Sequence, residues 1–127
     1  MLEPTLFRRA RHVASENKRV LSAADALSRG NIDVLGRSMF ESHRSLRDDY
    51  EVSTPELDWL VDTCASKAQV LGAKLTGAGF GGSVVALVRP DAIVATAREL
   101  SEGYAARFGR PLETLSVTPS DGVAEIA

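Results

Sequence analysis

Residues 74–87 read KLTGAGFGGSVVAL, and this stretch decides the fold. It begins within a short extended segment, residues 73–76, and ends in the run VVALV at residues 84–88. Because VVALV is β-prone, too short for a helix and apolar at every position, we expect a central strand that is covered on both faces. Four of the six residues from 77 to 82 are glycine, which adopts positive φ readily and lets other groups approach bare N–H groups. The sequence therefore predicts two strands joined by a glycine-rich loop.

The glycine string alone leaves open a tight β-turn without a ligand and a loop that binds phosphate. Gly77, Gly79 and Gly82 match G-x-G-x-x-G, but a dinucleotide site needs a helix after the loop, and a strand is expected there. A Walker A loop is excluded because no Gly-Lys-Ser/Thr ends the glycine string. Val84 completes the glycine-loop pattern of protein kinases, yet the chain has no H-R-D or D-F-G sequence and is too short for that fold.

Four helices are expected around these strands, because apolar residues recur at spacings of three and four. They span residues 6–29, 32–50, 55–71 and 91–108. Two further strands, residues 112–118 and 123–126, are expected at the end of the chain, joined by a Pro-Ser-Asp-Gly turn signal. The order ααα-ββ-α-ββ predicts an α+β domain with a mainly antiparallel sheet of about four strands.

Two local features of these helices concern the residue that caps the third helix and the element that packs against the second helix. Ser53 and Thr54 compete as the cap of the third helix, since Ser53 and Glu56 have capping-box spacing and Pro55 follows Thr54. Gly36 lies beside the apolar stripe of the second helix, and we expect it to permit close approach of another helix.

The first helix carries a single apolar seam. Its members recur every seven residues, with a second residue four positions later, and are Leu6, Ala10, Val13, Asn17, Val20, Ala24 and Leu27. At about 1.5 Å per residue this helix is about 36 Å long, which is long for a domain of this size. We therefore expect either a partner helix beside it or a cover that this chain does not supply. The isolated chain should self-associate or expose a large apolar patch.

The composition excludes several classes of protein and of site. The 127 residues suit one domain, residues 1–127, with 44% hydrophobic and 25% charged residues. A net charge of −2 gives no electrostatic footprint for nucleic acid or an anionic membrane. Cys64, the one cysteine, excludes an internal disulfide and a cysteine-based zinc cluster, and its place on a buried stripe predicts an inert core thiol. No apolar run approaches the ~20 residues of a membrane span, so we expect a soluble, cytoplasmic protein.

No arrangement of side chains predicts a catalytic or metal site. His43 lies on the apolar stripe of the second helix, where a buried, hydrogen-bonded histidine and a role in shaping a cleft are both open. Trp59 lies off the apolar face of the third helix and predicts a packing or interface contact. A solvated face or an ion-pair network is expected for Arg44, Arg47, Asp48 and Asp49.

Three segments together resemble the galactokinases of the GHMP family of small-molecule kinases. Residues 74–87 are similar to the third motif of that family, and residues 41–58 (ESHRSLRDDYEVSTPELD) look specifically like galactokinase. Residues 8–13 (RRARHV) are similar to the start of the same region, and the resemblance covers about residues 2–126. Ser83 stands where many relatives have Cys and Ala78 where Gly is frequent; both are small, so we expect the loop shape to be kept.

The resemblance implies the GHMP kinase C-terminal fold, a ferredoxin-like variant. An intact galactokinase would transfer the γ-phosphoryl of ATP to the C1 hydroxyl of galactose, with Mg²⁺. The glycine-rich loop would then help to form the nucleotide-phosphate cleft between the two halves of the enzyme. The implied cofactor-binding residues are Gly77, Gly79, Phe80, Gly81, Gly82 and Ser83.

The resemblance is to the C-terminal domain only. The sequence lacks the galactose-binding signature, the phosphate loop and the catalytic Asp of the family's N-terminal half. We therefore expect an absent N-terminal domain as partner, and neither galactokinase activity nor tight binding of ATP or Mg²⁺ from this chain alone. A free-standing, non-catalytic binding or regulatory module with this fold is the alternative. Galactose, N-acetylgalactosamine and other sugars stay open as substrates, because the sugar contacts belong mostly to the absent half.

Overall fold

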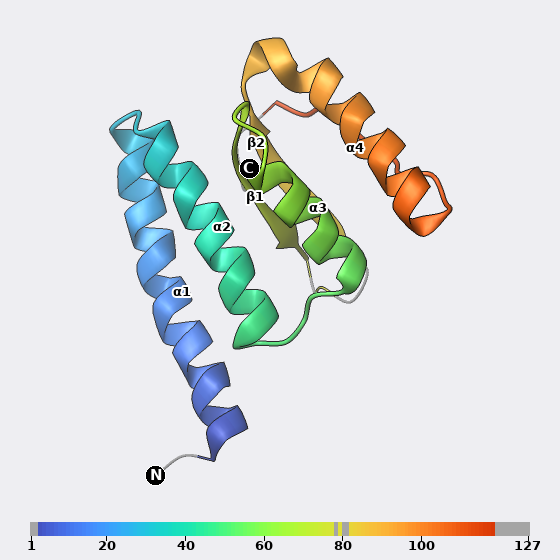
Figure 1. Ribbon diagram of the computed structural model, residues 1–127. Helices are drawn as coiled ribbons and strands as arrows, with labels where there is room; N and C mark the ends of the chain where they lie inside the picture. Colours follow the sequence, from blue (N-terminus) through green and yellow to red (C-terminus); the bar gives the residue numbers. More distant parts are fainter. Residues whose placement is uncertain (1–2, 78, 80–81, 119–127) are drawn as a thin grey trace, which may run out of the picture.

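The computed structural model describes residues 3–77, 79 and 82–118 of an α+β domain, as the sequence predicted. Its elements are α1 (Pro4–Ser28), α2 (Ile32–Asp48), α3 (Pro55–Ala65), β1 (Val70–Thr76), β2 (Ser83–Val88), the 3-10 turn η1 (Pro90–Ala92) and α4 (Ile93–Phe108). The first three helices and α4 follow one another across the molecule, beside an antiparallel pair of strands (Figure 1). α2 and α3 pack on β1, whereas α1 contacts α2 and α4 contacts α3.

The helices begin and end where local capping dictates. Asn31 accepts a hydrogen bond from the Val34 amide at the start of α2. Thr54 caps α3 through the Leu57 amide (3.3 Å), which settles the competition with Ser53. Gly109 ends α4 in the left-handed conformation, with φ of 69°.

The change from α3 to β1 comes earlier than predicted. The expected helix to residue 71 and strand from residue 73 are wrong at this junction, because α3 ends at Ala65 and β1 begins at Val70. The turn between them is closed by hydrogen bonds from the Lys67 amide to the Cys64 carbonyl and from the Val70 amide to the Lys67 carbonyl. Helical spacing of Ala68 and Leu71 gave the wrong prediction, because pairing of residues 70–76 with β2 overrides the local pattern.

The described residues form two strands of the four expected. Residues 112–118 are irregular, so the strand predicted there is wrong. The side chains of Leu115 (83%) and Val117 (70%) are exposed, and this β-prone run has no partner strand among the described residues to give it ladder hydrogen bonds. The strand predicted at residues 123–126 lies outside the described residues. Among the described residues β2 pairs only with β1, so its predicted central place stays a prediction.

The core lies between the helices and the strands. Its larger cluster joins α3 to both strands through Val61, Cys64, Val70 and Ala73, with Val84 and Leu100 packed against it. Burial raises the pKa of the Cys64 thiol to about 11, which keeps it protonated and agrees with the predicted inert core thiol. Trp59 packs edge-on against Tyr104 and Phe108 of α4, with ring centroids 6.1 and 5.9 Å apart, which confirms its predicted packing role.

The closest backbone approach joins α2 to β1 at two glycines. A Cβ added to Gly36 would lie 2.0 Å from the Leu71 carbonyl oxygen, and one added to Gly72 would lie 2.6 Å from the Gly36 Cα. Gly36 therefore does permit close approach, but of a strand and not of the helix that was predicted. The reason is that α2 crosses the face of β1, where only two residues without side chains fit.

The apolar seam of α1 faces away from the rest of the described domain. Leu6, Val13, Val20 and Leu27 are 53–59% exposed, whereas His12 and Ala26, on the other side of the helix, are buried against α2. A partner helix does run beside α1, but it covers the opposite face. These exposed side chains agree with the second alternative of the prediction, an exposed apolar surface. No helix among the described residues is long and apolar enough to cross a membrane.

Candidate functional site

The glycine-rich loop joins β1 to β2 at one end of the hairpin. Gly77 and Gly79 have φ of 79° and 85°, a region that residues with a side chain rarely adopt. Gly77, Gly82 and Ser83 are exposed and Gly79 is half-buried. The other two predicted cofactor-binding residues, Phe80 and Gly81, lie outside the described residues. The assignment of all six residues to a nucleotide site therefore stays a prediction. It concerns a loop in which Gly77 and Gly79 have positive φ.

Gly79 packs directly on the segment between α2 and α3. A Cβ added to it would lie 2.3 Å from the Val52 carbonyl oxygen and 3.0 Å from the Val52 Cβ. Val52 is itself buried against Leu57 and Leu75. Residue 79 must therefore be glycine both for its φ and for this contact. The galactokinase-like segment at residues 41–58 thus supplies the surface on which the glycine-rich loop packs, and we call Val52 the loop seat.

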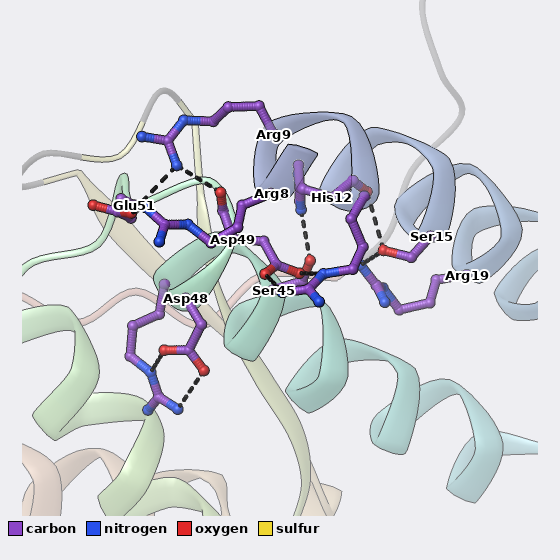
Figure 2. Close-up of polar contacts among 11 residues, drawn as sticks. Arg8, Arg9, His12, Ser15, Arg19, Ser45, Asp48, Asp49 and Glu51 are labelled. Carbon is purple, nitrogen blue, oxygen red and sulfur yellow. Dashed lines mark hydrogen bonds and ion pairs between the residues drawn. The ribbon is translucent and has the colours of Figure 1, made fainter. Parts of the chain in front are cut away.

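Arginines at the start of α1 hold that seat in place (Figure 2). Arg9 donates to the Asp49 carbonyl oxygen (2.6 Å), and both Arg8 and Arg9 pair with the Glu51 carboxylate. Glu51 has φ of 59°, which is uncommon for a residue with a side chain. Arg11 pairs with the Asp49 carboxylate and lowers the pKa of that group by hydrogen bonding and by its charge. One exposed ion pair contributes at most about 1 kcal/mol, but here several converge on residues 49–51, next to the loop seat.

His43 ties α2 and α3 to the last residues of β1. Its Nδ1 accepts a hydrogen bond from the Leu75 amide (3.1 Å), so its Nε2 carries the ring proton and donates to Asp58 (2.9 Å). The Ser53 hydroxyl donates to the same Asp58 oxygen at 2.6 Å. With only 2% of its surface exposed, His43 is the buried, hydrogen-bonded histidine of the two predicted alternatives. It supports the strand that leads into the glycine-rich loop.

A second polar link joins α1, α2 and β1. Lys74 Nζ donates to the Ser42 hydroxyl (2.7 Å), which donates to the Glu16 carboxylate (2.6 Å), and Arg19 also binds Glu16 (2.9 Å). Burial alone would raise the pKa of Glu16, but hydrogen bonds from Ser42 and Arg19 and the nearby cations outweigh it and lower that pKa. Sequence reasoning missed this link. The signal in the sequence was that polar residues occur on helix and strand faces that otherwise pack against neighbours; these residues are Glu16, Arg19, Ser42 and Lys74.

An open groove of about 460 Å³ lies between α2 and α3. It is lined by Arg37, Phe40, Glu41, His43, Arg44, Arg47, Val61, Asp62 and Ala65. Arg47 pairs with Asp48 (2.8 Å), as expected for an ion-pair network. None of the four described loop residues lines this groove, so we do not assign it to the predicted nucleotide site.

Stability is expected to fall as the pH is lowered from about 7.5 to 5.5, in part because of His12. The ring of His12 is buried and bonded to the Ser45 hydroxyl (2.8 Å), and this burial lowers its pKa below the ordinary value. The unfolded chain therefore binds a proton at His12 at higher pH than the folded chain does, so acidification favours unfolding. Urea unfolding should show a shallower pH dependence for His12→Gln than for the unchanged chain. Equal slopes would contradict this role of His12.

Comparisons with known proteins agree with the geometry. The family described as "GHMP kinases C terminal" matches residues 23–106. Galactokinase from Chloroflexus aurantiacus is 48% identical over 98% of this chain and 32% of its own length, and galactokinase from Thermotoga maritima is 46% identical over 98% and 36%. The chain thus spans about a third of the length of these relatives.

Two solved structures share the fold. Lactococcus lactis galactokinase complexed with galactose superposes with a TM-score of 0.82 and 44% identity, over 86% of this chain and 28% of that one. L. major mevalonate kinase in complex with R-mevalonate gives a TM-score of 0.59 and 26% identity, over 80% and 35%. With a family match over most of its length and a glycine-rich loop seated on the segment that resembled galactokinase, this chain belongs to the C-terminal family of the GHMP kinases.

Proposed function

We propose that this chain is the C-terminal domain of a galactokinase, and that its glycine-rich loop forms one wall of the nucleotide-phosphate cleft. The intact enzyme would transfer the γ-phosphoryl of ATP to the C1 hydroxyl of galactose, in the cytoplasm. The observation that carries the proposal is the seating of Gly79 on Val52, because it makes the loop shape depend on the segment that resembles galactokinase. Identity of 42–48% to eight galactokinases supports the same substrate class.

This chain contributes the shape of one wall of the phosphate cleft. Exposed backbone at Gly77, Gly82 and Ser83 leaves room for phosphate oxygens to reach main-chain amides, and small residues permit the close approach. Among residues 3–77, 79 and 82–118 no three His, Cys, Asp or Glu side chains gather to hold a metal ion. We therefore assign Mg²⁺ to none of these described residues. In the intact enzyme ATP and Mg²⁺ supply the phosphoryl group and its charge neutralisation, and the positioning falls to both halves.

A chimeric enzyme tests this proposal. The matched region of Lactococcus lactis galactokinase is replaced by residues 1–127, and ADP release is measured with ATP, Mg²⁺ and galactose. We expect turnover from the chimera and none from the isolated chain. Ser83→Cys in the chimera should leave turnover close to unchanged, because both side chains are small and residue 83 is exposed.

The outcome that would overturn the proposal is a folded chimera that neither binds ATP nor turns over. It would favour a non-catalytic module with the same fold. Turnover by the isolated chain, after contaminating kinases have been excluded, would contradict the proposal that catalysis needs both halves of the enzyme.

A further inference from the structure

One face of α1 is apolar and open to solvent along its length. We define the α1 stripe by its six large members, each more than half exposed: Leu6, Phe7, Val13, Val20, Leu21 and Leu27. Between the edges of the stripe the exposed positions are Ala10, Ala14, Asn17 and Ala24. The exposed charged residues Arg11, Lys18 and Asp25 lie along the edge that holds Phe7, and the Arg11 guanidinium lies over the Phe7 ring, 5.6 Å from its centroid. From the first member to the last, the stripe covers 21 residue steps, or about 32 Å of helix.

The charged residues of α1 that pair within the domain lie off the centre of this stripe. Arg8, Arg9 and Arg11 bind residues 49–51, and Glu16 and Arg19 bind each other, on or beside the face that packs against α2. The centre of the stripe therefore carries no charged side chain and no ion pair. A row of six large apolar side chains, each more than half exposed along one helix, is the kind of surface that marks an interaction site.

We propose that the α1 stripe is the docking surface for an apolar helix from the part of a full-length kinase that lies outside the matched third. Its seven-residue repeat at Leu6, Val13, Val20 and Leu27 is the spacing by which one helix packs along another. The alanines between the large side chains allow a second backbone to come close.

The length of the relatives supports this choice of occupant. The matched region is 32–36% of the Chloroflexus and Thermotoga galactokinases and 28% of the Lactococcus lactis chain, so most of each relative is available to cover the stripe. This inference rests on the proposed function, since it takes the architecture of a full-length galactokinase. A second copy of this chain is the competing occupant, and the experiment separates the two.

Val20→Glu is the test variant, and Lys18→Glu is the matched control on the same helix. Both are made in the isolated chain and in the Lactococcus chimera, and melting temperature, sedimentation and binding of a hydrophobic dye are measured. We expect the isolated chain to be monomeric, to bind the dye, and to melt at nearly the same temperature with either substitution, because Val20 is 59% exposed there. In the chimera, Val20→Glu should lower the melting temperature by about 5 °C or more, while Lys18→Glu should leave it unchanged.

Four results would overturn the proposal. One is equal melting temperatures for the two chimeric variants, and another is dye binding by the chimera as strong as that of the isolated chain. The third is an isolated dimer that Val20→Glu dissociates, which would make the second copy the occupant. A chimera that fails to fold while the isolated chain folds would also count against a fitted docking surface. Melting temperature does not depend on phosphoryl transfer, so a stable chimera without turnover contradicts the proposed function alone.

Discussion

Gly36→Ala is expected to lower the free energy of unfolding by about 3 kcal/mol or more. The added methyl group would lie 2.0 Å from the Leu71 carbonyl oxygen, and 2.5 Å from its carbonyl carbon, so α2 must move away from β1. Both elements carry core residues, and their separation opens the core on that side. Urea unfolding followed by circular dichroism measures the change.

Gly103→Ala in α4 is the matched control for Gly36→Ala. Its added methyl group would meet only the far edge of the Trp59 ring at 2.9 Å, and that side chain can shift. Alanine is also favoured over glycine inside a helix by about 0.5–1 kcal/mol, which offsets part of the crowding. We expect its unfolding midpoint to stay near that of the unchanged chain. Midpoints that fall equally for the two variants would refute the argument from backbone contact.

Gly79→Ala in the chimeric enzyme should reduce turnover or ATP affinity by about a hundredfold, the scale expected when a binding element moves by about 1 Å. Its φ of 85° makes any side chain unfavourable, and the new Cβ would lie 2.3 Å from the Val52 carbonyl oxygen. The loop must therefore leave its seat on the segment between α2 and α3. ADP-release kinetics and melting temperature are measured together.

Gly77→Ala separates strain from displacement. Its φ of 79° imposes similar backbone strain, but a Cβ there would have no neighbour within 4 Å. We expect a loss of stability of about 1–2 kcal/mol from strain alone, with kinetic constants much closer to normal. If Gly79→Ala also melts at a lower temperature but keeps normal kinetics, the loop serves only the strand connection and not the nucleotide.

The tertiary structure explains why three separated motifs occur together. Arg9 in the first motif binds the Asp49 carbonyl, Val52 in the second seats Gly79 in the third, and His43 binds the Leu75 amide. Each contact joins residues at least 27 positions apart in the sequence. The sequence shows the three motifs as separate segments that share one resemblance. It does not predict the contacts between them.

The sequence by itself determined the helices, the hairpin and the family. Caps such as Asn31, periodic apolar residues and the glycine string act within a few residues, so they can be read without a fold. The buried position of His43 could be read from the same periodicity. These features depend on hydrogen bonds and side-chain directions that are local to one segment.

Which segment packs against each face of a helix or strand follows from the tertiary structure alone. That structure placed Leu71 in a strand and not in a helix, and it packed β1 against Gly36. It also left residues 112–118 irregular, with no strand partner among the described residues. It also turned the seam of α1 outward and buried His12 instead. The physical reason is that periodicity marks a face as apolar but not its neighbour, since the neighbour is chosen by packing and strand pairing between segments far apart in the chain.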